Sequence, residues 1–172
     1  WLVLEEKDGK LFLLSRYALD HKRYDTEDEN DTWEKCTLRA WLNNEFINTA
    51  FTAKEKDSII TVTIPAEKRN SEDIGSENDT QDKVFLLSID EADKYFESNT
   101  KRRCMPTSYA VANGVSLDSF HSKYCWYWLR SPAYKGGRAA AVGVGGSVVH
   151  EGASVDFDKY GVRPALWIDL NS

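Results

Sequence analysis

Glycine is distributed unevenly along this chain, because seven of its ten glycines lie between Gly136 and Gly161. Glycine weakens helices and supplies the backbone conformations that tight turns need. Short runs rich in Val, Ala and aromatic residues alternate with these glycines, which is the pattern of short strands joined by turns. The last third of the chain therefore predicts an antiparallel meander. The expected strands are residues 126–129, 140–144, 147–150, 154–157 and 162–168.

The first part of the chain carries signals for a hairpin and for helices. Within residues 1–15, two apolar runs flank an Asp-Gly pair, a strong signal for a two-residue hairpin turn. Thr37 is a candidate N-cap for an amphipathic helix, and capping boxes at Thr52 and Ser88 predict two more helices. Helices early and a sheet late indicate an α+β domain, with the hairpin and two to three helices packed on the C-terminal sheet. Further short elements are expected at residues 60–64, 84–87 and 109–113.

One segment interrupts this order. Residues 66–82 contain a single large apolar side chain, Ile74, and are expected to form an exposed polar loop. The length of 172 residues fits a single domain spanning residues 1–172.

The charge balance excludes two classes of partner. The 22 Lys and Arg against 28 Asp and Glu give a net charge of −6, which repels polyanions. We therefore expect no nucleic-acid partner, and no insertion into a membrane because no apolar stretch approaches the ~20 residues that a helix needs to span a bilayer. The chain begins at Trp1 and shows no secretory leader, which leaves its compartment open.

Catalytic and metal-binding motifs are not recognisable in the sequence. The three histidines are scattered, so neither a metal nor another cofactor is expected. The three cysteines are expected to be idle thiols, although a disulfide between two of them stays open. Cys104 follows Arg102 and Arg103, which would favour a reactive thiolate, but no base can be identified for it. A thiol-dependent enzyme is thus the less favoured alternative, and we expect a protein that is not an enzyme.

Residues 133–160 combine small, regular apolar positions with a chemically mixed set of other side chains. Tyr, Ser, Gly and Asp are typical of binding loops, where rigid aromatics and adaptable polar groups make the contacts. The pattern suggests a scaffold that presents a recognition surface, and an ordinary exposed sheet with unselected surface residues is the alternative. The candidate ligand-binding residues are Tyr134, Arg138, Val144, Ser147, Val149, His150, Glu151, Ser154, Asp156, Phe157, Lys159 and Tyr160.

Three longer motifs carry a resemblance to a family. They are DTWEKCTLRAWLNNEFINTAF (residues 31–51), TQDKVFLLSIDEADKYF (residues 80–96), and YWLRSPA with GVRPALWIDL near the end. The chain resembles a domain-of-unknown-function family common in gut bacteria, which implies a C-type-lectin-like fold, in the branch of the formylglycine-generating enzymes. It also resembles the variable proteins of diversity-generating retroelements, in which an error-prone reverse transcriptase randomises template adenines and rewrites the C-terminal coding region.

This resemblance implies fixed borders around a variable region. Residues 128–132 and 161–167 would be the borders, Arg163 would be a buried charge that holds backbone carbonyls or a carboxylate, and residues 133–160 would vary. Randomised AAC codons become NNC, which cannot encode Lys, Glu, Gln, Met or Trp. Residues 133–160 contain only Lys135, Glu151 and Lys159 from that set. The scaffold positions carried over are Ala139, Ala140, Val142, Gly146, Val148, Gly152 and Val155.

The function that follows is recognition or adhesion by a diversified surface, at the cell surface or outside the cell. The ligand would be a protein or glycan on another cell, a phage or a host, and a fixed structural or adhesive lectin-like domain is the main alternative. None of the four prolines lies in the Glu-Pro-Asn or Gln-Pro-Asp motif of calcium-dependent lectins, and no cysteine follows Cys125, where formylglycine-generating enzymes carry a pair. We expect the aromatic anchors Tyr134, Phe157 and Tyr160 to be replaceable together with little effect on stability.

Overall fold

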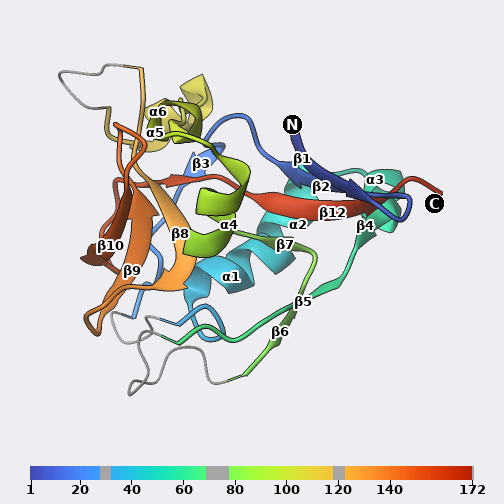
Figure 1. The fold of residues 1–172 in the computed structure, drawn as a ribbon, viewed down its shortest axis with the longest axis horizontal. Helices are drawn as coiled ribbons and strands as arrows, with labels where there is room; N and C mark the ends of the chain where they lie inside the picture. The colour runs from blue at the N-terminus through green and yellow to red at the C-terminus, as the bar shows by residue number, and fades with distance from the viewer. Residues whose placement is uncertain (28–31, 69–77, 118–122, 172) are drawn as a thin grey trace.

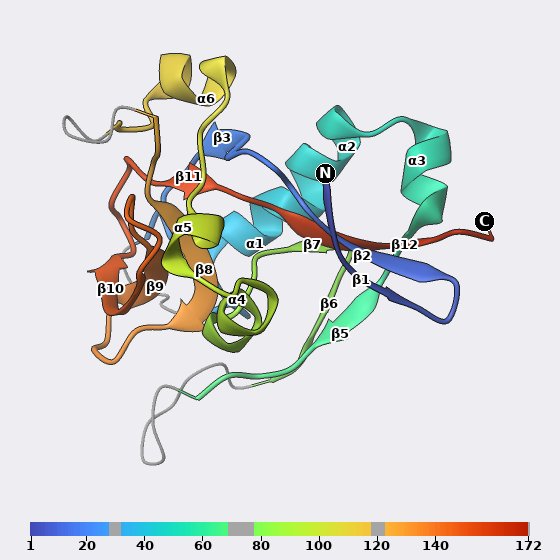
Figure 2. The same cartoon turned by 45° about the horizontal axis from the view of Figure 1, so that its top comes forward.

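The computed structural model describes residues 1–27, 32–68, 78–117 and 123–171. These residues form a mixed α+β structure, as the sequence predicts, in which two five-stranded sheets lie toward opposite ends of the long axis (Figures 1 and 2). The expectation that the N-terminal hairpin packs on the glycine-rich sheet is wrong, because the hairpin belongs to the other sheet, where it pairs with the last strand. Both termini lie at the end that carries the first sheet (Figure 1).

The first sheet joins the start of the chain to its end. The predicted hairpin is confirmed: Lys7 pairs with Lys10 across a turn in which Asp8 and Gly9 have φ of 51° and 72°. The second strand of the hairpin then pairs antiparallel with the last strand of the protein. In order, the sheet contains β1 (Leu2–Lys7), β2 (Lys10–Leu14), β12 (Ala165–Asp169) and β4 (Ile59–Ile60), and β7 (Val84–Phe85) also pairs with β12.

The second sheet contains the glycine-rich meander. In order, it contains β10 (Val148–Ser154), β9 (Arg138–Val142), β8 (Tyr127–Pro132), β11 (Gly161–Val162) and β3 (Asp20–His21). The expectation of one strand at 162–168 within the meander is wrong, because these residues are divided between β11 in this sheet and β12 in the first sheet, with Pro164 between them. The expectation of separate strands at 147–150 and 154–157 is wrong, because Val148 to Ser154 form one strand. Gly152 has a φ of +59° at a register shift against β9, so a bulge kinks the strand without ending it.

Two neighbouring segments connect the sheets. The chain passes from β2 to β3 near its start and from β11 to β12 near its end, and these passages run antiparallel to each other. Between the paired strands, the Ser15 amide donates to the Pro164 carbonyl at 2.8 Å and the Leu19 amide donates to the Val162 carbonyl at 2.9 Å. The ends of the chain thus fix one sheet relative to the other.

The helices confirm most of the capping signals. Both capping boxes are present, but the first helix is capped by the Cys36 sulfur, which accepts from the Arg39 amide at 3.5 Å. Thr37 is the first helical residue instead, because its amide donates to the buried Asp25. The helices are α1 (Thr37–Trp41), which continues through a π-helical turn (Leu42–Phe46) into α2 (Ile47–Ala50), then α3 (Ala53–Ser58), α4 (Ile89–Tyr95), α5 (Asn99–Arg102) and α6 (Ser108–Asn113).

The expected loop at 66–82 is partly wrong. Its last residues form β6 (Thr80–Asp82), which pairs with β5 (Val62–Ile64), and both Thr80 and Asp82 are buried. Residues 69–77 lie outside the described part of the chain.

One hydrophobic cluster draws on both sheets and on the helices, with Phe12 and Leu14 from the first sheet and Trp128 and Leu129 from the second. In the part of the chain that is described, no helix has the length and apolar character needed to cross a membrane.

Candidate functional site

The meander has an inner layer with no room for larger side chains. Ala139, Ala140, Val142 and Val155 are completely buried. A Cβ on Gly152 would lie 2.2 Å from the Ala139 carbonyl oxygen, which is far inside van der Waals contact. Of the seven positions carried over as scaffold, six are buried and Val148 is half-buried.

The twelve predicted ligand-binding residues surround this inner layer, and we call them the display face. None of them is buried. They come from the β8–β9 turn, the start of β9, the β9–β10 turn, β10 and the segment that follows it. Six are exposed, namely Tyr134, Ser147, Glu151, Asp156, Phe157 and Lys159. Six are half-buried, namely Arg138, Val144, Val149, His150, Ser154 and Tyr160.

Tyr134 and His150 form the clearest contact on the display face. Their rings stack with centroids 5.4 Å apart at 18°, and the Tyr134 amide donates to the His150 carbonyl at 3.1 Å. The Tyr134 side chain is 57% exposed, so the stack is open to solvent. Arg138 links β9 to β10 close to this stack, because its guanidinium donates to the Glu151 and Gly152 carbonyls at 2.8 and 2.6 Å.

Tyr160 has a different role from Tyr134. Its ring stacks on Trp126 with centroids 5.2 Å apart and contacts Trp128 at 4.6 Å, while Phe157 meets it edge-on at 4.8 Å. Burial raises the pKa of Tyr160, and the positive charge of Arg138 opposes this rise. These contacts argue against the expectation that Tyr134, Phe157 and Tyr160 can be replaced together with little effect on stability, because the Tyr160 ring packs on two tryptophans. The sequence analysis also did not single out Trp126 as a residue of the site, although the aromatic residues beside it in the sequence, Tyr127 and Trp128, could have indicated an aromatic cluster.

This contrast leads to a prediction for single alanine variants. Tyr160→Ala should lower the free energy of unfolding by about 2 kcal/mol, since it removes a half-buried ring between two tryptophans. Tyr134→Ala should change it by less than about 1 kcal/mol, because an exposed ring is lost. Urea denaturation of both variants measures the difference, and equal losses would contradict the distinction.

The β9–β10 turn is held from outside the sheet. Arg102 donates to the Gly146 carbonyl at 2.8 Å, Arg103 to the Gly145 carbonyl at 3.2 Å, and the Asn99 side chain to the Ser147 hydroxyl at 3.2 Å. Helix α5 therefore fixes the turn that presents Val144 and Ser147.

A cavity of about 400 Å³ opens beside the Tyr134–His150 stack. Its opposite wall comes from the β8 border and from the start of α4, so it joins the display face to the predicted fixed border. Ser131 is central, because its hydroxyl accepts from the Ile89 amide at 2.9 Å and donates to Glu67. The lining residues are Glu67, Lys68, Ile89, Asp90, Ser131, Pro132, Tyr134 and His150.

Arg130 sets the charge beneath this cavity. Its buried guanidinium donates to the Leu86 carbonyl at 2.9 Å and contacts Glu91. Its Nε lies 2.9 Å from Glu67 Oε1, an ion pair without hydrogen-bond alignment. Burial raises the pKa of Glu67, the charge of Arg130 and the Ser131 hydrogen bond oppose the rise, and the nearby Glu91 and Asp90 add to it.

The raised pKa of Glu67 predicts a pH dependence of stability. Between the ordinary value of 4.5 and its raised value, the folded protein holds a proton on Glu67 that the unfolded chain has lost. The contribution of Glu67 to stability is therefore full below 4.5 and is lost as the pH rises through that window. Glu67→Gln should remove this dependence. The melting temperature of the variant minus that of the wild type should therefore increase as the pH is raised from about 4 to about 8. Parallel melting curves across this range would contradict the assignment.

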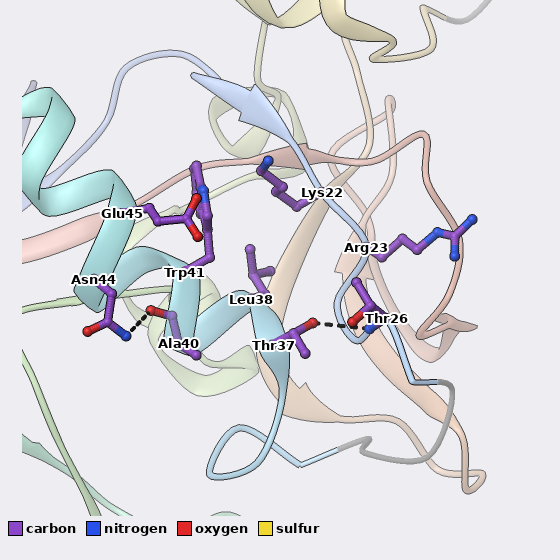
Figure 3. A pocket seen from close by; sticks show the side chains of 9 residues that line it. All are labelled: Lys22, Arg23, Thr26, Thr37, Leu38, Ala40, Trp41, Asn44 and Glu45. Atoms are coloured by element: carbon purple, nitrogen blue, oxygen red, sulfur yellow. Dashed lines mark hydrogen bonds between the residues drawn. The ribbon is translucent and has the colours of Figure 1, made fainter.

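A second hollow, of about 360 Å³, lies along α1 beside Trp41 (Figure 3). The Lys22 ammonium lies 4.8 Å from the centre of the Trp41 ring. Two of the polar groups are already used within the fold, since the Asn44 amide donates to the Ala40 carbonyl and the Thr37 hydroxyl accepts from the Thr26 amide. These two groups are therefore engaged within the fold and less available to a ligand.

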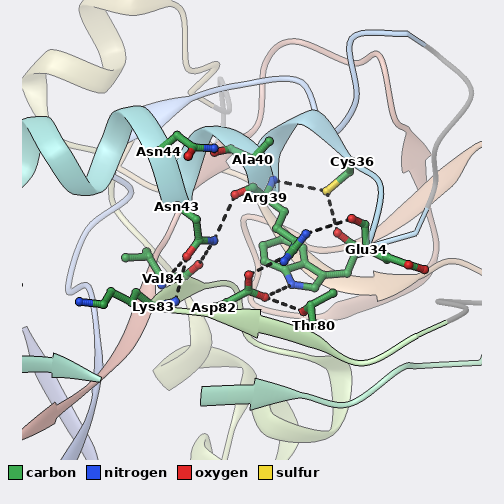
Figure 4. Close-up of polar contacts among 11 residues, drawn as sticks. Glu34, Cys36, Arg39, Ala40, Asn43, Asn44, Thr80, Asp82, Lys83 and Val84 are labelled. Atoms are coloured by element: carbon green, nitrogen blue, oxygen red, sulfur yellow. Dashed lines mark hydrogen bonds and ion pairs between the residues drawn. The ribbon is translucent and has the colours of Figure 1, made fainter. Parts of the chain in front are cut away.

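Beneath the helix lies a polar network around Asp82 (Figure 4). One oxygen of the buried carboxylate accepts from Arg39 at 2.8 Å, and the other accepts from Trp33 Nε1 at 2.9 Å and from the Thr80 hydroxyl at 2.6 Å. The Asn43 side chain binds the neighbouring strand, accepting from the Lys83 and Val84 amides and donating to the Val84 carbonyl. The network ties α1 and the π-helical turn to β6 and β7.

The buried charge expected at Arg163 is present. Its guanidinium donates to the Ser15 carbonyl at 3.0 Å and to the Arg102 carbonyl at 3.2 Å, and it lies over the Phe96 and Tyr127 rings. Arg163 therefore joins the two crossing segments to α5.

Cys104 does not lie in an open site. It is 1% exposed, and its thiol donates to the carbonyls of Arg16 and Met105, at 3.9 and 3.5 Å. Among the residues with a described position, no three His, Cys, Asp or Glu are grouped so that they could hold a metal ion.

Comparison with known proteins gives a family but no relative of known function. No curated protein and no solved structure matches the chain. The model of the family described as Domain of unknown function (DUF6273) matches residues 8–170, which is nearly the whole chain. The protein is therefore a member of the DUF6273 family.

Proposed function

We propose that this protein is a recognition module, not an enzyme, with a C-type-lectin-like fold, and that its display face binds a protein or glycan on another cell, a phage or a host. The division of residues 133–160 carries the proposal. Six of the seven scaffold positions are buried alanines, valines and glycines, whereas none of the twelve display residues is buried. A surface of this kind can change its side chains without changing its core.

The ligand would meet aromatic anchors beside a hollow. Tyr134 and Phe157 are 57% and 42% exposed, and aromatic side chains of this kind often dominate binding energy. The 400 Å³ cavity beside Tyr134 adds a concave site, lined by the Ser131 hydroxyl, the carboxylates of Glu67 and Asp90, and the His150 imidazole. Such a surface suits either a loop of a protein or a sugar that stacks on an aromatic ring.

Diversification is the second part of the proposal. The motifs bordering residues 133–160 resemble those of retroelement variable proteins. Gly146 and Gly152, two of the positions expected to be fixed, have no room for a Cβ. Binding partners of this class are reached outside the cell, so we place the domain at the cell surface or beyond it.

Binding to glycan arrays and to intact bacterial and host cells tests the proposal. The variant Tyr134→Ala, Asp156→Ala, Phe157→Ala should lose binding by about tenfold or more, because it removes both exposed anchors. The control variant Lys54→Ala, Asp57→Ala, Leu170→Ala changes exposed residues near the opposite end of the molecule (Figures 1 and 2) and should bind like the wild type. Equal binding by all three proteins would place the binding site elsewhere.

A further inference from the structure

Two of the three cysteines face each other across a β-bridge. Cys104 and Cys125 are antiparallel bridge partners, and the Cys125 amide donates to the Cys104 carbonyl at 2.9 Å. Directly opposed residues of antiparallel strands have Cα atoms about 4.5–5.5 Å apart, which lies within the 4.4–6.8 Å range of natural disulfides. Their side chains also project from the same face of the bridge.

Both thiols lie in the core. The Cys125 thiol donates to the Cys104 backbone carbonyl at 3.7 Å, and both residues are at most 1% exposed. Burial raises the pKa of Cys104, but the neighbouring Cys125 thiol and the charge of Arg163 outweigh it and lower this pKa. The neighbouring Cys104 thiol and burial raise the pKa of Cys125. In the folded protein each thiol therefore shifts the pKa of the other, as adjacent groups do.

The third cysteine is engaged elsewhere. The Cys36 sulfur caps α1 and its thiol donates to the Trp33 carbonyl at 3.6 Å. Burial raises the pKa of Cys36 to about 12, so little thiolate is present at neutral pH.

We propose that Cys104 and Cys125 form a disulfide when the protein folds in an oxidising compartment, and that Cys36 stays reduced. One of the two cysteines, as its thiolate, attacks a small-molecule disulfide and releases one thiolate. The other cysteine, after losing its proton, then attacks the protein sulfur of this mixed disulfide and releases the second thiolate. The two cysteines lose two protons and two electrons in total, and the oxidant gains the electrons as two thiols. Since both sulfurs are buried in the native fold, the bond forms during folding.

The cross-link would restrain the segment on which Tyr160 of the display face packs. Cys125 directly precedes Trp126, the ring on which Tyr160 stacks, and the Gly161 amide donates to the Trp126 carbonyl at 2.8 Å. The bond would close a loop that runs from residue 104 to residue 125 and includes α6. Constraining that loop in the unfolded chain stabilises the folded state.

Refolding in a glutathione redox buffer tests this proposal, with peptide mapping and intact mass as the readout. The wild type and the Cys36→Ser variant should each lose the mass of two hydrogen atoms and yield a linked peptide pair containing Cys104 and Cys125. Oxidised Cys36→Ser should melt about 5–10 °C above the same protein after reduction. Cys104→Ser and Cys125→Ser should each remain monomeric with free thiols.

Other products would overturn the proposal. A bond that involves Cys36, a bond only between molecules, or three thiols still free after refolding would each show that the pair is not a disulfide site. An oxidised form that melts at or below the reduced form would show that the bond strains the fold and is not part of it.

Discussion

Gly146→Ala is expected to lower the free energy of unfolding by about 3 kcal/mol or more. A Cβ at this position would lie 1.7 Å from the Asn99 carbonyl oxygen and 2.5 Å from its carbon, and the residue has a φ of +88°. The clash would be with the backbone of Asn99, which cannot move away as a flexible side chain could. Arg102 also holds the two segments together, because it donates to the Asn99 side chain and to the Gly146 carbonyl. The variant must therefore separate the β9–β10 turn from α5.

Two other glycines of the meander turns serve as matched controls for Gly146, Gly137 in the β8–β9 turn and Gly145 in the β9–β10 turn. Gly137 also has a positive φ, +70°, but nothing lies within 4 Å of its Cβ position, so Gly137→Ala should cost about 1–2 kcal/mol from backbone strain alone. Gly145 has open space and no positive φ, so Gly145→Ala should be neutral or slightly stabilising. Urea denaturation of the three variants measures the order. Equal costs would mean that contact with α5 does not hold the turn.

Asp82→Ala is expected to cost about 3 kcal/mol, the second large effect. The change removes the acceptor for three donors, of which Trp33 Nε1 and the Thr80 hydroxyl belong to buried residues. Arg39 is 26% exposed at its side chain and can turn to water, so the loss comes mainly from the two buried donors. Because Asp82 joins β6 to Arg39 of α1, the variant should also loosen the contact between these two elements.

Chemical denaturation and hydrogen exchange of Asp82→Ala test this expectation. Exchange should rise first at the Val62–Ile64 and Thr80–Asp82 strands, where the network ends. Asp57→Ala, at an exposed position of α3, is the control and should change stability by less than about 0.5 kcal/mol. If Asp82→Ala matched this control, the network would contribute nothing to the fold.

Local features of the fold could be predicted from the sequence because they are encoded within a few residues. The Asp-Gly turn and the two capping boxes involve side chains one to three positions apart, and each is present in the structure. The alternation of small residues with glycine likewise indicated the inner layer of the meander. In contrast, Thr37 could not be excluded as a cap without knowing that its amide meets Asp25.

Long-range pairings could not be predicted in the same way. Nothing local shows that the hairpin pairs with the last strand, or that Thr80 and Asp82 turn inward to meet Trp33. The same limit applies to the candidate site. The twelve display residues could be selected by pattern, but Tyr160 differs from Tyr134 only through contacts with Trp126 and Trp128, and the cavity wall at Glu67 is distant in sequence.

Sequencing the 3′ end of this gene, with its flanking DNA, across a natural population tests the recognition surface most directly. Amino-acid differences should concentrate at display positions such as Tyr134, Asp156 and Phe157, arise at adenines, and spare Ala140, Gly146 and Gly152. A near-copy of the segment should lie beside a reverse-transcriptase gene. Differences spread equally over display and buried positions, or a region 133–160 identical in every copy, would contradict a diversified recognition surface.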